Sequence, residues 1–435
     1  MPARCLLTLL SAVLAVCLLA GCPPPPQENA TPSPSTNAGG ATSQPSGEGG
    51  KIRFLAMEYD TGTRGFMKKL EEGFNRDNPG CELSIEVVDW NSGKDKLNTL
   101  ISSGNPPDLV NVGSRWIPEF VAIDAVEPLD SYVTQEFRDK FLPIALQGAQ
   151  YQGKLYGLPI AVSARALYYN KGILDAAGVQ PPKTWDEIIS VSKKINAPDK
   201  GQFAFGIQGN KVETDVYFYY FLWANGGEIL SEDGKSAVFN SEAGVQALQF
   251  MCDLVSKHKV TEPNPTAYDR EGLQEQFKSG KLAMMITGPW FWGMLDKQTP
   301  NLKYDLAPIP ASKKQVTMAV TDDIILMKGS KNKQAAWKFV EYFYQPALRQ
   351  EWAQTFGMLP ELKAVAESDF IKKSPQWSKF MELLPTGKFV PLHPKWTAVE
   401  DEVRTSIQEA LMGKKSPKQA LDEAAQRVDK VISGS

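Results

Sequence analysis

The chain has 435 residues and a mass of 48.0 kDa, more than one hydrophobic core usually serves, so two lobes or domains are expected. Apolar residues make up 42% of the chain and charged residues 22%, which excludes a disordered chain or one with many membrane spans. The formal net charge of −3 argues against nucleic acid as a partner, because phosphate contacts need a basic face.

The N-terminal segment has the composition of a targeting sequence. Arg4 precedes an apolar run, residues 6–20, that is too short to span a bilayer comfortably. The run ends in LAGC, which resembles the lipobox of bacterial lipoproteins. We therefore expect a lipoprotein signal peptide at 1–21 and a lipid such as palmitate on Cys22. A plain signal peptide with an incidental cysteine is the alternative.

The segment that follows Cys22 cannot build a core. Residues 23–50 include no Val, Ile, Leu, Met or aromatic residue and consist largely of Pro, Ser, Thr, Gly and Ala. Such a tract cannot bury enough apolar surface to fold, so 22–50 is predicted to be a lipidated cysteine and a disordered tether. An anchored, extracytoplasmic protein with a soluble body is expected, at a cell surface or in a periplasm.

Two cysteines remain for the folded body, Cys81 and Cys252. No pair of cysteines has metal-ligand spacing, and we expect neither a metal nor a cofactor. An exported chain could join Cys81 to Cys252 in a disulfide. Burial as small apolar side chains is the alternative that we favour.

Alternating hydrophobic patterns predict an α/β body. Short apolar strands are expected at 52–57, 83–88 and 108–112, with helical spacing between them. This β-α-β-α-β order predicts a parallel sheet covered by helices on both faces.

The segment 153–188 has the clearest local signals. A buried strand is expected at 166–170, followed by a short helix that Gly178 ends. Pro181 and Pro182 interrupt regular structure. Thr184 then begins a new helix, with Glu187 placed to complete a capping box.

This segment also resembles a known family. The phrases GKLYGLP, ALYYNK and TWDEI, with a later GPW at 288–290, are similar to those of extracellular solute-binding proteins (family 1, sugar-binding type) of bacterial ABC importers. The resemblance implies a two-lobe periplasmic-binding-protein-like fold (type II) with a hinge. It places 51–161 plus 286–320 in the N-lobe and 162–285 plus 321–435 in the C-lobe.

The resemblance also implies a function. A monomer would capture a carbohydrate, with an oligosaccharide favoured, by hinge closure and deliver it to the membrane permease. The sequence contains no G-x-x-x-x-G-K-[ST], H-E-x-x-H or G-x-S-x-G motif and only two histidines, so no enzyme is expected. Two alternatives remain. Asp322 and Asp323 could serve a carbohydrate-active enzyme, or Arg115 and Arg165 could bind a glycerophosphodiester or peptide in the same transport role.

Aromatic rings match the apolar face of a sugar, and polar side chains match its hydroxyl rim. We select residues that follow strands or lie at turns, where α/β proteins place their ligand crevice. The candidates are Tyr59, Asp60, Trp90, Ser114, Arg115, Trp116, Arg165, Trp223, Trp290, Asp322, Asp323 and Trp396. Structural roles are the alternatives for some: helix entry for Asp60, a helix core for Trp223, a surface charge for Arg115 and an ion pair within one lobe for Arg165.

Overall fold

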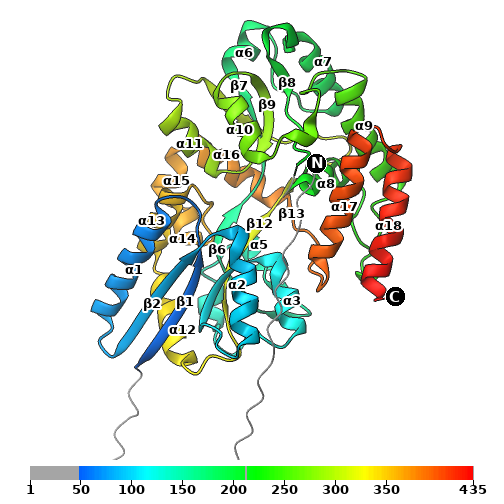
Figure 1. The fold of residues 1–435 in the computed structure, drawn as a ribbon. Coiled ribbons are helices and arrows are strands. Elements are labelled where there is room, and N and C mark those ends of the chain that lie inside the picture. The colour runs from blue at the N-terminus through cyan, green and yellow to red at the C-terminus, as the bar shows by residue number, and fades with distance from the viewer. Residues whose placement is uncertain (1–48, 211–212, 435) are drawn as a thin grey trace, which may run out of the picture. The chain divides into compact units, whose positions relative to one another are not determined.

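The computed structural model describes residues 49–210 and 213–434. The predicted signal peptide, Cys22 and nearly all of the predicted tether lie outside the described residues. Two sheets, each with its own buried apolar core, divide the described residues into two lobes (Figure 1).

The first lobe contains a five-stranded sheet. Its strands lie in the order β2 (Cys81–Val88), β1 (Gly50–Met57), β3 (Leu109–Gly113), β12 (Val320–Leu326) and β6 (Gly157–Ser163). Strands β2, β1 and β3 are parallel, as the β-α-β-α-β pattern predicts. Strand β12 runs antiparallel to both β3 and β6.

The second lobe contains a four-stranded sheet. Its strands lie in the order β10 (Tyr304–Ala307), β7 (Ala166–Asn170), β9 (Leu282–Thr287) and β8 (Phe203–Phe205). Strand β7 is antiparallel to both neighbours, and β8 is parallel to β9. Two short pairs complete the strands: β4 (Gln150–Tyr151) with β5 (Lys154–Leu155), and β11 (Thr317–Met318) with β13 (Gly387–Lys388).

Helices cover both sheets. Those packed on the first core are α1 (Thr63–Asp77), α2 (Trp90–Ser102), α3 (Ile117–Ala122), α4 (Gln135–Arg138), α12 (Lys333–Phe343), α13 (Pro346–Phe356) and α14 (Lys363–Ala366). Helix α5 (Pro143–Gln147) contributes to both cores. Those of the second lobe are α6 (Lys171–Ala176), α7 (Trp185–Ile195), α8 (Thr214–Ala224), α9 (Glu242–Ser256), α10 (Arg270–Lys278), α11 (Trp290–Gln298), α15 (Asp369–Lys373), α16 (Pro375–Leu383), α17 (Trp396–Leu411) and α18 (Pro417–Ser433).

The structure corrects the predicted lobe boundaries in the second half of the chain. The range 286–320 was expected in the N-lobe, but β10 pairs with β7 in the second sheet. The range 321–435 was expected in the C-lobe, but β12 lies inside the first sheet and α12 to α14 pack on the first core. These boundaries are what the family resemblance implies. The sequence pattern does not correct them, because a buried strand has the same apolar pattern in either sheet.

Local signals predict the helix starts well. Thr184 Oγ1 accepts a hydrogen bond from the Glu187 amide at 3.2 Å, as a capping box requires. The Glu187 carboxylate accepts from the amide of Lys183, at 2.6 Å, one residue before the expected partner. Helix α2 begins at Trp90, where the Asp89 side chain caps it by accepting from the Asn91 amide.

The chain passes between the lobes three times: from β6 to β7, from β11 to β12, and from α14 to α15. The first two crossings are neighbours. The Arg165 amide donates to Thr317 Oγ1 at 2.8 Å, and the same hydroxyl donates to the Arg165 carbonyl at 2.6 Å. Val320 then pairs with Ser163 at the edge of the first sheet. One threonine side chain therefore fastens the first two crossings to each other.

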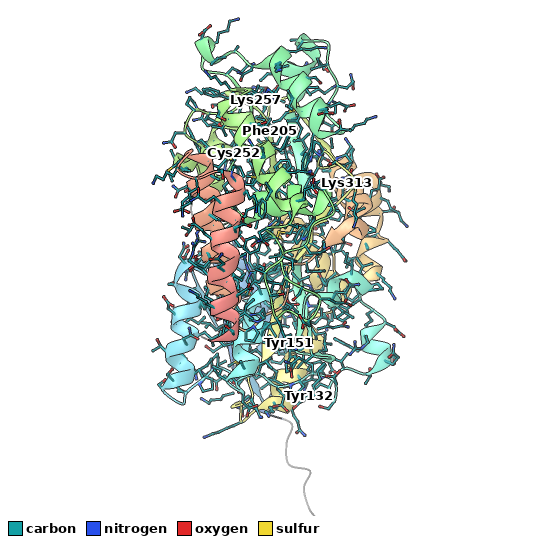
Figure 2. The ribbon with its side chains drawn as sticks, turned by 90° about the vertical axis from the view of Figure 1, so that its right-hand side faces the viewer. Tyr132, Tyr151, Phe205, Cys252, Lys257 and Lys313 are labelled. Carbon is teal, nitrogen blue, oxygen red and sulfur yellow. The ribbon has the colours of Figure 1, made fainter. Side chains whose placement is uncertain are left out.

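Cys81 and Cys252 are both buried, and no disulfide joins them. Cys252 lies on α9 of the second lobe (Figure 2). Cys81 begins β2 of the first lobe. Burial raises the pKa of the Cys252 thiol to about 12, which suits an apolar packing role. Across residues 49–210 and 213–434, no helix has the length and apolar character needed to cross a bilayer.

A buried ion pair supports the first lobe beside its exit strand. Arg349 Nε donates to Glu361 Oε1 at 2.6 Å, and both side chains are almost fully buried. The guanidinium also donates to the Ile160 carbonyl of β6 and lies 4.5 Å from the ring centroid of Phe343. Each charge is therefore compensated only by its partner and by nearby groups of this lobe.

Arg349→Ala should lower the free energy of unfolding by about 3–5 kcal/mol, because it leaves the Glu361 charge buried without its partner. Denaturant unfolding of the variant measures the loss. Lys373→Ala is the control, since its pair with Asp369 is exposed and should contribute less than about 0.5 kcal/mol. A loss of similar size in both variants would contradict the structural role given to Arg349.

Candidate functional site

The first lobe presents an aromatic cluster at the carboxyl ends of its parallel strands. Tyr59 follows β1, and its ring contacts Trp90 edge-on, with centroids 5.8 Å apart. Trp90 begins α2 and contacts Trp116 at a centroid distance of 5.5 Å. All three side chains are half-buried. The structure therefore brings three predicted residues together where α/β sheets place their ligand crevices.

Asp322 adds a carboxylate to this cluster. The Tyr59 hydroxyl donates to Asp322 Oδ2 at 3.0 Å. Asp322 lies on β12 directly opposite Gly113, the last residue of β3. Burial raises the pKa of Asp322 to about 6, although the hydrogen bond from Tyr59 and the charge of Arg115 oppose this shift. Rings and a carboxylate thus lie side by side on the first lobe.

Two predicted acids are not part of this cluster. Asp323 is fully buried and accepts from Thr321 Oγ1 at 3.0 Å, and burial raises its pKa well above the usual range. Successive strand residues face opposite sides, so Asp322 and Asp323 do not form an acid/base pair at one site. Asp60 is exposed, and its Oδ1 accepts from the Gly62 amide at 2.8 Å in the turn before α1.

Trp290 lies at the junction of the two lobes. It begins α11 in the GPW turn and packs against both apolar cores. Gly357, at the end of α13, approaches closely: a Cβ there would lie 3.1 Å from the Trp290 Cα. The left-handed backbone of Gly357, with φ of 65°, also favours glycine at this position. Trp290, a predicted ligand-binding residue, therefore contacts elements of the first lobe as well as its own.

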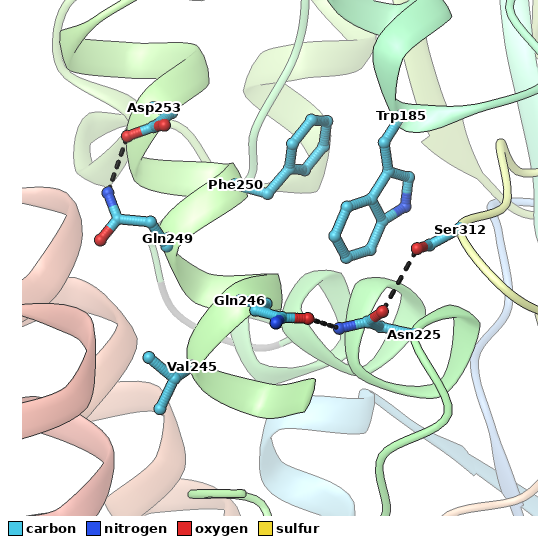
Figure 3. A pocket seen from close by; sticks show the side chains of 8 residues that line it. All are labelled: Trp185, Asn225, Val245, Gln246, Gln249, Phe250, Asp253 and Ser312. Atoms are coloured by element: carbon cyan, nitrogen blue, oxygen red, sulfur yellow. Dashed lines mark hydrogen bonds between the residues drawn. The ribbon is translucent and has the colours of Figure 1, made fainter. Parts of the chain in front are cut away.

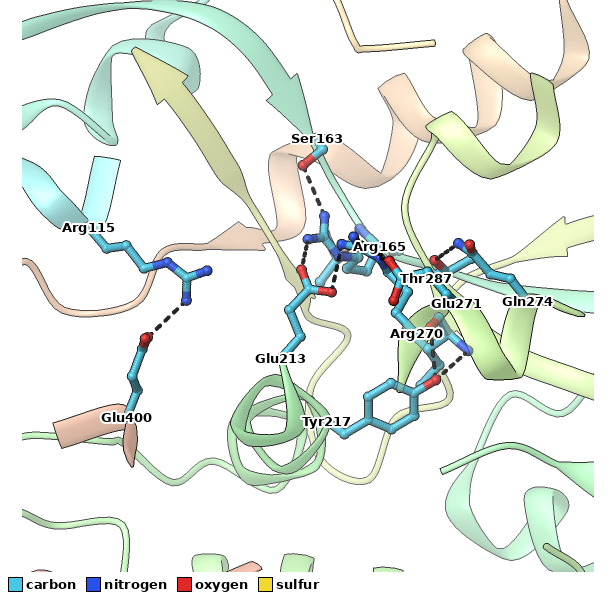
Figure 4. A network of polar contacts seen from close by, with 12 residues as sticks. Arg115, Ser163, Arg165, Glu213, Tyr217, Arg270, Glu271, Gln274, Thr287 and Glu400 are labelled. Carbon is cyan, nitrogen blue, oxygen red and sulfur yellow. Dashed lines mark hydrogen bonds and ion pairs between the residues drawn. The ribbon is translucent and has the colours of Figure 1, made fainter. Parts of the chain in front are cut away.

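Two arginines lie over the Trp290 ring. The guanidinium carbons of Arg165 and Arg270 are 4.9 Å and 5.3 Å from the ring centroid. Glu213 holds both, accepting from Arg165 Nη2 at 3.0 Å and from Arg270 Nη1 at 3.1 Å (Figure 4). Arg165 Nη1 also donates to Ser163 Oγ at 2.9 Å. Arg165 thus forms the ion pair within one lobe that the sequence left open.

Glu213 itself was not predicted. Burial would raise its pKa, but the charges of Arg270, Arg165 and Arg115 outweigh burial and lower the pKa to about 2. It precedes α8, and an acid before a helix is more often a capping residue than a site residue. The sequence pattern does not identify its partner Arg270 either, because an arginine at the start of a helix is usually a surface charge.

A second set of polar contacts joins the first lobe to α17. Arg115 Nη1 pairs with Glu400 Oε2 at 3.0 Å (Figure 4). One turn earlier on α17, Thr397 Oγ1 donates to Glu119 Oε1 at 2.7 Å and accepts from Lys94 Nζ at 2.9 Å. Arg115 is therefore not a free surface charge.

The remaining candidates are more deeply buried. Ser114 lies in the short 3-10 turn (Ser114–Trp116) that follows β3. Trp223 on α8 and Trp396 at the start of α17 are both almost fully buried, and Tyr219 contacts each, with ring centroids 5.7 Å and 6.3 Å away. Trp223 belongs to the buried core of the second lobe, the alternative that its helix, apolar on most sides, indicates.

A separate groove lies elsewhere, on the second lobe (Figure 3). Its volume is about 450 Å³, and its lining residues are Trp185, Asn225, Val245, Gln246, Gln249, Phe250, Asp253 and Ser312. Trp185 stacks on Phe250 at 4.6 Å, and Asn225 bonds both Gln246 and Ser312. Asn225, Gln246 and Ser312 thus hydrogen-bond to one another, whereas Trp185 Nε1 has no partner among the described residues. We favour the residues between the lobes as the site, because several predicted candidates meet there.

No group of three or more His, Cys, Asp or Glu side chains within the described ranges is arranged to hold a metal ion. The arrangement between the lobes instead offers tryptophan and tyrosine rings beside carboxylates and paired arginines. Such a surface can bind a ligand that has both an apolar face and a polar rim.

Comparison with known sequences places this arrangement in a family. The family described as bacterial extracellular solute-binding protein matches residues 59–350. A protein of Brucella abortus (strain 2308) described as a binding protein is 37% identical over 390 residues, which cover 89% of this chain and 94% of that protein. The maltotriose-binding protein of Pyrococcus abyssi is 29% identical over 336 residues, covering 75% of this chain and 70% of that protein.

Solved structures agree with the fold. An ABC transporter solute-binding protein from Thermotoga lettingae, bound with α-D-tagatose, has a TM-score of 0.79 at 26% identity and covers 88% of this chain and 99% of its own. The maltose-bound MalE3 of T. maritima has a TM-score of 0.77 at 26% identity and covers 87% and 98%. The predicted two-lobe α/β fold is confirmed.

Glu213→Gln should lower the free energy of unfolding at pH 7 by on the order of 3 kcal/mol, because the folded-state pKa is depressed to about 2. A depressed pKa gives stability above the ordinary value near 4.5 that is lost as the pH falls toward 2. The difference between variant and wild type should therefore shrink across this window in urea unfolding.

Glu271→Gln is the control, since Glu271 binds the same Arg270 but its side chain is 65% exposed. It should change stability by less than about 0.5 kcal/mol at either pH. A Glu213→Gln difference that is constant from pH 7 to pH 3 would contradict the assignment.

Proposed function

This chain belongs to the family of bacterial extracellular solute-binding proteins, as its sequence resemblance predicted, and we propose that it captures a carbohydrate between its lobes. An ABC importer permease would then receive the carbohydrate. The observation that carries the proposal is the grouping of Tyr59, Trp90, Trp116 and Trp290 with carboxylates and arginines at the facing ends of the two lobes. Rings match the apolar face of a sugar, and the polar groups match its hydroxyls.

The charge balance favours a neutral ligand over a phosphate. Arg115 pairs with Glu400, while Arg165 and Arg270 share Glu213. A glycerophosphodiester would have to displace one of these carboxylates or bind without a compensating positive charge, and Asp322 would repel it. Hydroxyl groups can hydrogen-bond to the same pairs without separating them. The related maltotriose-binding and maltose-bound proteins support a saccharide, with an oligosaccharide preferred.

Hinge closure is the proposed mechanism. The neighbouring crossings at Arg165 and Thr317 are two of the three that join the lobes, and ligand that contacts both lobes favours the closed form over the open one. The permease would recognise that closed form. The proposal includes no reaction of the ligand, which fits the separate environments of Asp322 and Asp323. A monomer suits a protein that closes on its own ligand.

Lipid anchoring completes the proposal. Cleavage after Gly21 would leave Cys22 to carry two or more acyl chains, since one chain gives only marginal membrane binding. The Pro- and Gly-rich residues that follow would then hold the binding body near its permease at an extracytoplasmic membrane surface.

A thermal-shift screen tests the ligand class. Maltose, maltotriose, diacetylchitobiose, D-tagatose and ribitol are compared with glycerophosphocholine and a short peptide. We expect a saccharide to raise the melting temperature, because a ligand that binds only the folded state stabilises it by mass action. Trp290→Ala should weaken binding of that saccharide by about 30-fold or more, as truncation of a central aromatic contact does.

Trp337→Ala is the matched control, because Trp337 lies on α12 and donates to Glu341 away from the facing ends of the lobes. Its affinity should equal that of wild type. A response to glycerophosphocholine or the peptide alone would replace the carbohydrate in the proposal. Equal binding by Trp290→Ala would remove the ligand from the place that we assign.

Cys22→Ser should abolish lipid attachment in a bacterial host that processes lipoproteins. Metabolic labelling with palmitate and fractionation of membranes measure the outcome. We expect label and membrane association in wild type, and neither in the variant. Label that persists in Cys22→Ser would show that Cys22 does not carry the lipid.

A further inference from the structure

Several buried polar atoms of the second lobe have no hydrogen-bond partner among the residues that the structure describes. Three of them lie on two packed helices: Asp215 Oδ2 and the Tyr219 hydroxyl on α8, and Trp396 Nε1 at the start of α17. The three side chains are at most 1% exposed. Native proteins pair nearly all such atoms, so a cluster of them needs an explanation.

The three residues lie close to one another. Asp215 and Tyr219 are four residues apart and so share one face of α8. The Tyr219 ring contacts the Trp396 ring at 6.3 Å and the Trp223 ring at 5.7 Å. Two helices thus bring an acceptor, a donor and a hydroxyl to the same place.

The cluster borders the contact between the lobes. Glu400 lies one turn after Trp396 on α17 and pairs with Arg115 of the first lobe. Burial, then the charge of Glu400, raise the pKa of Asp215 to about 7, while Arg115 and Arg404 lower it. The charged residues near Asp215 therefore come from both lobes: Glu400 from the second lobe and Arg115 from the first. Opening of the lobes would separate Arg115 from Glu400 at this point.

The donor and acceptor types define the complementary ligand group. The indole N–H only donates, an ionised carboxylate only accepts, and a phenol can do both. Sugar hydroxyls both donate and accept, so a hydroxyl can donate to Asp215 while it accepts from Trp396. The indole and phenol rings provide an apolar surface beside these atoms. A phosphate would instead meet the Asp215 carboxylate.

We propose that Asp215, Tyr219 and Trp396 form a saccharide subsite on the second lobe that satisfies its unpaired atoms with ligand hydroxyls. The inference rests on the proposed carbohydrate-binding function and adds Asp215 and Tyr219 to the residues that determine its specificity. The subsite would fill while the lobes are apart and would be enclosed when Arg115 meets Glu400.

Tyr219→Phe and Trp396→Phe test the subsite, because each removes one unpaired polar atom and keeps an aromatic ring. The probe is whichever saccharide of the thermal-shift panel stabilises wild type most. Without ligand, the melting temperature should be unchanged or raised, since no protein hydrogen bond is lost. Affinity measured by calorimetry should fall at least about tenfold in each variant. Asp215→Asn should also reduce affinity.

Tyr217→Phe is the matched control on the same helix. The Tyr217 hydroxyl is already satisfied, because it donates to the Ile286 carbonyl at 2.9 Å. This variant should show the opposite pattern, with a lower melting temperature and unchanged affinity. The comparison separates a hydroxyl that waits for a ligand from one that stabilises the fold.

The inference is overturned if Tyr219→Phe and Trp396→Phe bind the probe as wild type does. It is also overturned if they lose melting temperature as Tyr217→Phe does without any loss of affinity, because the atoms would then have a structural role. If Trp290→Ala loses affinity for the probe while Tyr219→Phe and Trp396→Phe keep it, the proposed function is supported and the subsite is rejected. If no saccharide stabilises wild type, both fail at that first step.

Discussion

Arg165 connects two of the chain crossings between the lobes to the candidate site. Its backbone forms both hydrogen bonds to the Thr317 hydroxyl, where these two crossings lie side by side. Its guanidinium pairs with Glu213 and lies over Trp290. A rotation of one lobe against the other would therefore change the backbone next to Arg165, the residue that lies over the Trp290 ring. In the proposed mechanism, this arrangement would let ligand contact and lobe closure depend on one another without a separate relay.

The arginines at the site are compensated before any ligand arrives. Glu213 serves two of them and Glu400 serves Arg115, so the protein does not need a bound anion to balance these charges. A buried charge without a partner is expensive, which explains why the network holds its geometry. The same balance makes the surface suitable for hydroxyls, which gain charge-assisted hydrogen bonds and add no charge of their own.

The sequence predicted elements and strand-end residues better than it predicted tertiary partners. The parallel β1–β3 sheet, the Thr184 cap and the placement of Tyr59, Trp90, Trp116 and Trp290 follow from local pattern and family resemblance. It misassigned β10 and β12, because an apolar strand does not specify its sheet. The sequence does not identify Glu213, Arg270 or Tyr219, because their contacts are with residues distant in the chain. It does select Asp60, whose side chain instead stabilises the turn before α1.

Each lobe places a tyrosine close to an aspartate, but the hydrogen bonding of these groups differs between the lobes. On the first lobe, a tyrosine already donates to the neighbouring carboxylate, Tyr59 to Asp322. On the second, Tyr219 and Asp215 lie one turn apart with unpaired atoms. Under the proposed function, a ligand would replace or extend existing hydrogen bonds on one side and supply missing ones on the other. The second lobe would gain more from each ligand hydroxyl, since an unpaired buried group is costlier than a paired one. With the proposed lobe closure, this asymmetry would let ligand bind the second lobe before the first closes over it.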